Sequence, residues 1–487
     1  MRLTDSITIH YIPFHIAENV DISAKMRESE LWQYHPIKVE NNTLYDHVAD
    51  FMNNKMHDDA ANGNGCVIYS LNSKSQIASR LNNKIFRIDA KGHDISFKFC
   101  NDKKMSSPKL VLYPKISIGV LTFGVEINHT ENTIPEELME LNYMLHKLDK
   151  QAPEITRFYG NKQPHEKSLE NDRMFYKKMS GQEDAVGFTI PQIINAMLAD
   201  FSNDETRLVN KSRTHLFTYL QIDKPVDKQF KETYVRILRA ENANYAITEN
   251  DLDSKYFTQT FENIYVGSCL EGVVIAVSAG DDTTTFIKQY KSRVLLCYFW
   301  IYFLVYIQRL ALIHITSCIT SIKHADKLSL LVEQLSEIKL NTYFPDISDY
   351  TQHNEFYKLC SKNLNNSVYL ESVSDKISSL YYMLDRQHQE KEEIHNNQLR
   401  KINEEETEFS NQMNQRIALL TSAQICFAAM VFFDVSINIF KLCNFRYSIG
   451  EIILMAFCVV PVGYFIYHAA KLISLARKKT KQKRHKK

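Results

Sequence analysis

Hydrophobic and polar positions divide the chain near Gly280 into two parts that differ in periodicity. Before this residue, runs rich in β-branched and aromatic residues predict strands. Between the third and fourth of these runs, leucines three and four positions apart predict a helix. We therefore expect a first domain of the α+β class. The predicted strands are Ser6–Ile12, Asp94–Cys100, Lys109–Asn128, His215–Ile222 and Ile264–Ser278, and the helical spacing is carried by Leu138, Leu141, Leu145 and Leu148.

The second part of the chain has the pattern of long helices. Neither glycine nor proline occurs from Asp346 to Ile449, and these two residues are the main breakers of helices. We expect one helix from about Ser374 to Phe440, which would be roughly 100 Å long at ~1.5 Å per residue. Its apolar residues recur close to a heptad seam, which must be buried against a partner. We therefore expect self-association through Ile377, Leu380, Leu384, Leu399, Ile402, Phe409, Met413 and Leu420.

Two segments near the C-terminus are long and apolar enough to span a membrane. Ile417–Phe440 contains one charged residue, Asp434, and Ile452–Ala470 contains none. Each can cover a hydrocarbon core of about 30 Å. A third apolar segment, Val294–Ile307, is only fourteen residues long. It falls short of a span, so we expect it to be a buried helix of a soluble domain.

The distribution of charge predicts how these spans are oriented in the membrane. The chain carries 58 basic and 57 acidic residues, but eight of the last eleven residues, Arg477–Lys487, are Lys or Arg. The even balance argues against a direct nucleic-acid binder, and the basic end predicts a cytosolic tail by the positive-inside bias. Two spans joined by a short loop form a hairpin, so both termini are expected in the cytosol. The nine scattered cysteines fit a reducing compartment.

These patterns predict seven segments. They are a cytosolic α/β regulatory domain at 1–280, a helical layer at 281–372, a stalk helix at 373–416, a first transmembrane helix at 417–440, an external loop at 441–451, a second transmembrane helix at 452–475 and a basic cytosolic tail at 476–487.

The order of these segments resembles the CorA family of divalent-cation channels. The apolar and aromatic stretch Leu295–Leu312 also resembles the buried layer that precedes the stalk in that family. The resemblance implies a homopentamer in the inner or plasma membrane, with the first span lining the pore. It also implies Mg²⁺ or another divalent cation as the permeant or regulatory ion.

One departure from the family lies at the end of the first span. The family has a Gly-Met-Asn triplet there, usually followed by an aromatic residue, whereas this chain has Leu442-Cys443-Asn444-Phe445. Asn444 is therefore the counterpart at the external mouth. In this departure the chain resembles the CorA-like membrane effectors of type III CRISPR defence systems. That resemblance implies an enlarged cytosolic domain that responds to a nucleotide second messenger.

The first span has a polar face. At 100° per residue, Thr421, Gln424, Asp434 and Asn438 fall within about 140° of arc. Polar groups in lipid need partners or water, so one hypothesis is that this face lines a pore, with Asp434 forming a ring that favours cations. The alternative is structural: Thr421 and Gln424 bridge helices, Asn438 meets lipid headgroups, and Asp434 is neutral or pairs with Lys441.

Signals for an enzyme are missing from the sequence. No Walker loop, His-Glu-x-x-His motif, Cys-x-x-Cys pair or nucleophile elbow occurs, so we expect no catalytic activity. For a regulatory ligand, the segment 157–162 offers the guanidinium of Arg157 to a phosphate and two aromatic rings to a base. Asp223, after a predicted strand, could accept from ribose hydroxyls.

The resulting hypothesis is an oligomeric, CorA-like membrane channel or effector that a cytosolic ligand gates, with a nucleotide second messenger in antiviral defence as the narrower version. Two alternatives stay open. One is a transporter of magnesium or another divalent metal cation, and the other is a membrane-anchored coiled-coil scaffold that does not conduct.

Overall fold

The computed structural model describes most of the chain up to Leu442. The described residues are 1–17, 20–34, 43–52, 65–90, 93–100, 107–160, 166–202, 204–252, 256–278, 285–320, 325–442 and the single positions 453, 463, 464, 467, 470 and 471. They fall into two units, Met1–Tyr382 and Met383–Lys487.

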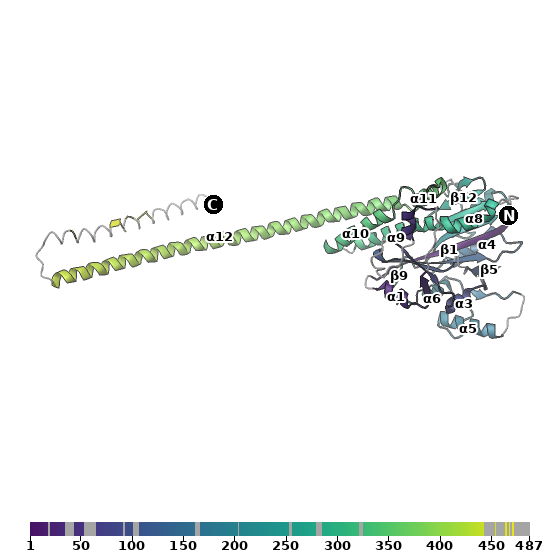
Figure 1. Ribbon diagram of the computed structural model, residues 1–487, viewed down its shortest axis with the longest axis horizontal. Helices are drawn as coiled ribbons and strands as arrows, with labels where there is room; N and C mark the ends of the chain where they lie inside the picture. Colours follow the sequence, from purple (N-terminus) through teal and green to yellow (C-terminus); the bar gives the residue numbers. More distant parts are fainter. Residues whose placement is uncertain are drawn as a thin grey trace. The chain divides into compact units, whose positions relative to one another are not determined.

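The first unit is built on one mixed β-sheet, which is in keeping with the expected α+β class (Figure 1). The central path runs β11-β12-β13-β10-β1-β7-β5-β4-β8. Among the described strands, β10 and β13 are the only parallel neighbours, and helix α7, Lys228–Leu238, lies between them in sequence. The described strands are β1 Leu3–Ile16, β2 Trp32–Tyr34, β3 Val67–Leu71, β4 Ile85–Ala90, β5 His93–Phe99, β6 Lys109–Tyr113, β7 Ile118–Ile127, β8 Thr156–Arg157, β9 Thr206–Leu208, β10 His215–Ile222, β11 Thr258–Phe261, β12 Ile264–Ser268 and β13 Gly272–Ser278.

Two predicted strands are hairpins in the structure. The run Lys109–Asn128 is broken by the short 3₁₀ turn η2, Pro114–Ile116, because proline cannot donate to a sheet ladder. Ser117 follows with φ of 54°, and the chain turns back so that β6 pairs with β7. In Ile264–Ser278, the turn after Ser268 makes the antiparallel pair β12–β13 in the same way.

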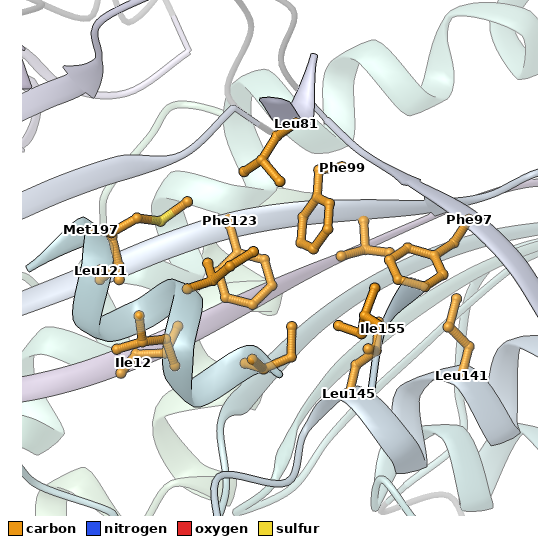
Figure 2. Packing of buried hydrophobic residues seen from close by; sticks show 14 of the residues in the cluster. Ile12, Leu81, Phe97, Phe99, Leu121, Phe123, Leu141, Leu145, Ile155 and Met197 are labelled. Atoms are coloured by element: carbon orange, nitrogen blue, oxygen red, sulfur yellow. The ribbon is translucent and has the colours of Figure 1, made fainter. Parts of the chain in front are cut away.

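The main core lies between one face of the sheet and helices α4, Pro135–Leu145, and α6, Ile190–Met197. Figure 2 shows side chains of the strands meeting side chains of these helices. The predicted leucines Leu138, Leu141 and Leu145 of α4 are buried, as is Leu148 beyond its end. The helical spacing therefore marks the face of α4 that packs on the sheet. The labelled members of this cluster are Ile12, Leu81, Phe97, Phe99, Leu121, Phe123, Leu141, Leu145, Ile155 and Met197.

Helix α9, Phe299–Ile319, packs on the opposite face of the sheet. Tyr11, the neighbour of Ile12 in β1, makes ring contacts with four aromatic residues of α9, as expected from the alternation of side chains along a strand. Almost every side chain from Phe299 to Leu312 is buried. The prediction that Val294–Ile307 forms a buried helix is therefore confirmed, with a π turn, η4 Val294–Tyr298, at its start.

The described helices are mostly short apart from α9 and α12. Their bounds are α1 Ile22–Glu28, α2 Asp46–Met52, α3 Gln76–Leu81, α4 Pro135–Leu145, α5 Glu166–Ser180, α6 Ile190–Met197, α7 Lys228–Leu238, α8 Thr285–Arg293, α9 Phe299–Ile319, α10 Ala325–Asn341, α11 Thr351–Asn363 and α12 Asn366–Leu442, with a 3₁₀ turn η3 at Glu249–Leu252.

Helix α12 contains 77 residues without a break, which corresponds to about 115 Å at ~1.5 Å per residue. It includes the whole of the expected helix from Ser374 to Phe440 (Figure 1). The region without glycine or proline is not a single helix, however, because α11 ends at Asn363. Asn365 makes the break with φ of 56°, a left-handed conformation that asparagine tolerates better than most residues.

Candidate functional site: the polar face and the buried start of helix α12

The predicted polar face lies on a continuous part of α12. Thr421, Gln424, Asp434 and Asn438 all belong to this helix and are exposed in the single chain. Since no break interrupts the helix between them, the 100° spacing holds and the four side chains share one face. The structure thus brings the four predicted residues onto one surface of one element.

Some hydroxyls of this segment are satisfied within the helix itself. The Thr421 hydroxyl donates to the carbonyl of Ile417 at 2.8 Å, and Ser436 donates to the carbonyl of Phe432 at 2.7 Å. Such bonds to the preceding turn lower the cost of placing a hydroxyl in lipid. The carboxylate and amide groups of the polar face are therefore the groups that most need partners outside the helix.

Asp434 is the charged member of this face. Within the described part of the single chain, neither Asp434 nor Lys441 takes part in an ion pair, and the structural alternative of an Asp434–Lys441 pair stays a hypothesis. An aspartate at the centre of a membrane helix costs about 2.5 to 3.5 kcal/mol on insertion scales. In a membrane, a carboxylate at this position would need water, a cation or a second chain.

In the expected seam of α12 the apolar side chains from Leu399 onward are exposed, whereas Ile377 is already buried in the single chain and is therefore not available for the expected self-association. The exposed fraction is 45 % for Leu399, 58 % for Ile402, 66 % for Phe409 and 48 % for Met413. Farther along, the segment from Ile417 onward exposes further large apolar residues. Two described helices, Gln289–Ile319 and Asn366–Asn438, are long and apolar enough to cross a membrane, and only the second has its apolar stretch free of burial.

The first residues of α12 are fixed by a buried polar network. The Asn366 side-chain amide donates to the carbonyl of Val305 at 2.8 Å and to Oε1 of Gln308 at 3.1 Å. The Gln308 amide in turn donates to the hydroxyl of Tyr357 at 3.0 Å. Because Asn366 and Gln308 are both fully buried, these bonds replace water that the groups lost on folding.

A guanidinium completes this anchor. Arg309 donates to the carbonyl of Leu364, which precedes the helix, and lies 5.0 Å from the ring centroid of Tyr369 in its first turns. The carbonyl of Leu364 and the ring of Tyr369 therefore share one cation. We name the set Gln308, Arg309, Leu364, Asn366 and Tyr369 the α12 anchor.

The predicted ligand residue Arg157 has an internal partner. Its guanidinium contacts both carboxylate oxygens of Asp172 at 3.1 Å and lies 4.6 Å from the ring centroid of Tyr159. Tyr159 also donates to Asp172; burial, followed by this bond, raises the pKa of the Tyr159 phenol to about 12. The Arg157 guanidinium, which was expected to bind a phosphate, is therefore already bound to the carboxylate of Asp172.

Asp223 is paired as well. One of its oxygens accepts from the backbone amide of Arg2 at 2.6 Å, and the other accepts from the Arg2 guanidinium at 2.9 Å. Burial opposes the charged carboxylate, but the hydrogen bonds and the charge of Arg2 outweigh it and lower its pKa. The carboxylate is therefore ionised at neutral pH. Whether Arg157 or Asp223 binds a ligand stays a prediction.

Other predicted parts lie outside the described residues. These are Asn444 at the expected external mouth, most of the expected external loop and second span, and the basic tail. In the part of the chain that the structure describes, no group of three or more His, Cys, Asp or Glu side chains could hold a metal ion.

Sequence patterns did not identify the α12 anchor. Its members come from two separate parts of the chain, Gln308–Arg309 and Leu364–Tyr369. A polar pair inside the apolar run of α9 was the one available signal, because a helix that is apolar all round has no reason to bury Gln308 without a partner. No family model, curated protein or solved structure matches the chain.

Proposed function

We propose that the chain forms a homo-oligomeric membrane channel whose conduction path is lined by the polar face of α12. In this proposal Thr421, Gln424, Asp434 and Asn438 face the path, and the apolar residues around them face lipid and neighbouring helices. The unit Met1–Tyr382 lies in the cytosol and controls opening in response to a ligand. A pentamer and a nucleotide messenger are the versions favoured by the resemblance to CorA-like effectors.

The observation that carries the proposal is the continuity of α12. One uninterrupted helix bears an exposed apolar seam, with Leu399 and Ile402, and an apolar segment of span length that contains Asp434. A seam needs other helices, and a carboxylate in lipid needs water or a counter-charge. A symmetric assembly around a water-filled path meets both requirements at once, because each copy contributes one carboxylate to a ring.

Gating requires a ligand that binds the open and the closed state with different affinities, whatever the identity of that ligand. A ligand shifts an equilibrium only as far as its affinities for the two states differ. The α12 anchor ties the first turns of the long helix to buried side chains of α9. A ligand that moves this anchor would therefore act on the helix that carries the proposed path.

Ion flux into liposomes tests the proposal against its alternatives. The purified full chain should pass K⁺ across the bilayer, while empty liposomes should not. Absence of flux at confirmed insertion would favour a non-conducting scaffold. Flux of Mg²⁺ that closes when Mg²⁺ is raised on the side of the N-terminal domain would favour a divalent-cation transporter, since intracellular magnesium is then the regulator.

A further inference from the structure

A cleft lies beside the break between α11 and α12. It has a volume of about 410 Å³, within the usual range for small-molecule sites. One wall is the turn between β12 and β13, and the other is the end of α11 with Asn365 of the break. Its lining residues include Arg239, Tyr256, Glu271, Lys362, Asn363 and Asn365.

The charged groups of the cleft differ in whether they already have a partner of opposite charge. Arg239 is held by Asp251, with 2.6 Å between guanidinium and carboxylate, and its guanidinium lies 5.0 Å from the ring centroid of Tyr256. Lys362, in contrast, is exposed and forms no ion pair with a described residue. The ammonium of Lys362 is therefore available to an anion, while Arg239 supports the ring.

Hydrogen-bonding groups complete the chemistry. The Asn363 amide donates to the carbonyl of Ser268 at 3.0 Å, which joins the two walls. Glu271, partly buried on the sheet side, offers carboxylate oxygens that accept from hydroxyls. An ammonium for a phosphate, a carboxylate for hydroxyls and an aromatic ring for a base form the set that a nucleotide requires.

We propose that this cleft binds a small phosphate-bearing nucleotide and that binding acts on the start of α12. The inference rests on the proposed function for its regulatory meaning, but not for the binding itself. A nucleotide that contacts Lys362 and Glu271 joins the last turn of α11 to the β12–β13 turn. It thereby holds the left-handed Asn365, which immediately precedes Asn366 of the α12 anchor.

Calorimetry on the full chain in detergent tests the binding, with AMP, adenosine and inorganic phosphate as probes. AMP should bind at least tenfold more tightly than either fragment, because only AMP supplies phosphate and base together. Lys362→Gln should weaken AMP binding about tenfold. Lys358→Gln is the matched control, because Lys358 lies on the same helix, is exposed and pairs with Asp346, and it should leave the affinity unchanged.

A second pair of measurements tests whether Glu271 contacts the ribose hydroxyls and whether AMP binding acts on the start of α12. Glu271→Gln should weaken AMP several-fold and leave 2′,3′-dideoxy-AMP unchanged. Hydrogen–deuterium exchange at residues 362–372 should slow when AMP is added. Equal AMP affinity in Lys362→Gln and Lys358→Gln, or no AMP binding to the wild type, overturns the proposal. Binding without ion flux would leave this cleft standing and remove the channel, whereas flux without binding would do the reverse.

Discussion

The side-chain amide of Asn366 donates a 3.1 Å hydrogen bond to Oε1 of Gln308, and both side chains are fully buried. The pair joins the first residue of the 77-residue helix to the middle of α9. A buried amide that loses its partner keeps the full cost of its desolvation. The start of α12 is therefore specified by polar pairing, in a region where most other contacts are apolar and less selective.

Asn366→Ala tests this relationship. The change leaves Gln308 Oε1 and the Val305 carbonyl without their donor and should lower the free energy of unfolding by about 1–3 kcal/mol. Urea unfolding followed by tryptophan fluorescence reports on the correct unit, because the two tryptophans of the chain, Trp32 and Trp300, lie in Met1–Tyr382. The neighbouring exposed Ser367→Ala should change stability by less than about 0.5 kcal/mol; equal effects would contradict the anchoring role.

The stability of the same unit should depend on pH through buried histidines. Burial, with a smaller contribution from Arg309, lowers the pKa of His215 from 6.5 to about 3. The unfolded chain therefore binds a proton that the folded chain does not, so stability is complete above about pH 6.5 and falls as pH decreases toward 3. The slope contributed by one such group is up to ~1.4 kcal/mol per pH unit.

His215→Gln removes this titration. Its unfolding profile between pH 6.5 and 4 should be less steep than that of the wild type, even though the loss of the contacts with Tyr302 and Tyr306 lowers stability at pH 7.5. The exposed His395 provides a control, and His395→Gln should keep the wild-type slope. A wild-type slope in His215→Gln would show that other groups carry the acid sensitivity.

Self-association is expected to depend on the exposed seam of α12. Replacing Leu399 and Ile402 together by Asp places like charges in a contact that excludes water, and the oligomer mass in detergent should fall. Lys391 lies on the same helix and is exposed, so Lys391→Asp serves as a control that changes the net charge by the same amount as the double variant. Sedimentation or light scattering would measure the mass, and an unchanged mass in the double variant would exclude the seam as the interface.

Conduction should depend on the carboxylate of Asp434. Asp434→Asn keeps the shape and hydrogen bonding of the side chain but removes its charge, so cation-over-anion preference should fall by roughly an order of magnitude while the oligomer mass stays the same. Reversal potentials of reconstituted protein give the preference. If selectivity is unaltered and stability drops instead, Asp434 has a structural role, and Lys441→Gln should then reproduce the loss of stability.

The two predicted ligand residues call for different experiments. Arg157→Ala leaves Asp172, whose side chain is 8 % exposed, without its partner, and loss of a buried partner costs about 3–5 kcal/mol. A loss of ligand response in that variant would reflect unfolding as readily as lost contact. Asp223→Asn removes a pair whose Arg2 side chain is 60 % exposed, and such pairs contribute about 1 kcal/mol or less. Because Asp223 does not line the cleft that contains Lys362 and Glu271, AMP should bind folded Asp223→Asn with wild-type affinity in calorimetric titration, and a clear loss of affinity would assign the contact with AMP to Asp223 instead.

The local pattern of hydrophobic and polar residues predicted those helices and strands whose buried side chains recur at regular intervals. The strand His215–Ile222 has the same bounds in the structure as in the prediction, since its residues alternate or run apolar over its whole length. The continuity of α12 over Ser374–Phe440 followed from the lack of glycine and proline. The burial of Val294–Ile307 was predicted from an apolar run of only fourteen residues, but the helix that contains it, Gln289–Ile319, is long enough for a bilayer and is mostly buried.

Tertiary structure decided where chain segments turn and which polar groups meet. Asn365 interrupts the helix inside the region without glycine or proline, and after its left-handed conformation Asn366 reaches Gln308; only the folded position of α9 supplies that acceptor. Arg157 was expected to face a ligand, which stays a prediction; only the folded structure shows that its guanidinium also contacts Asp172 on α5. The periodicity of a sequence predicts which side of a helix or strand is buried, because the hydrophobicity of each residue contributes to burial independently of distant residues. A hydrogen bond or ion pair depends on two residues distant in sequence, and their distance is set only when the elements between them pack.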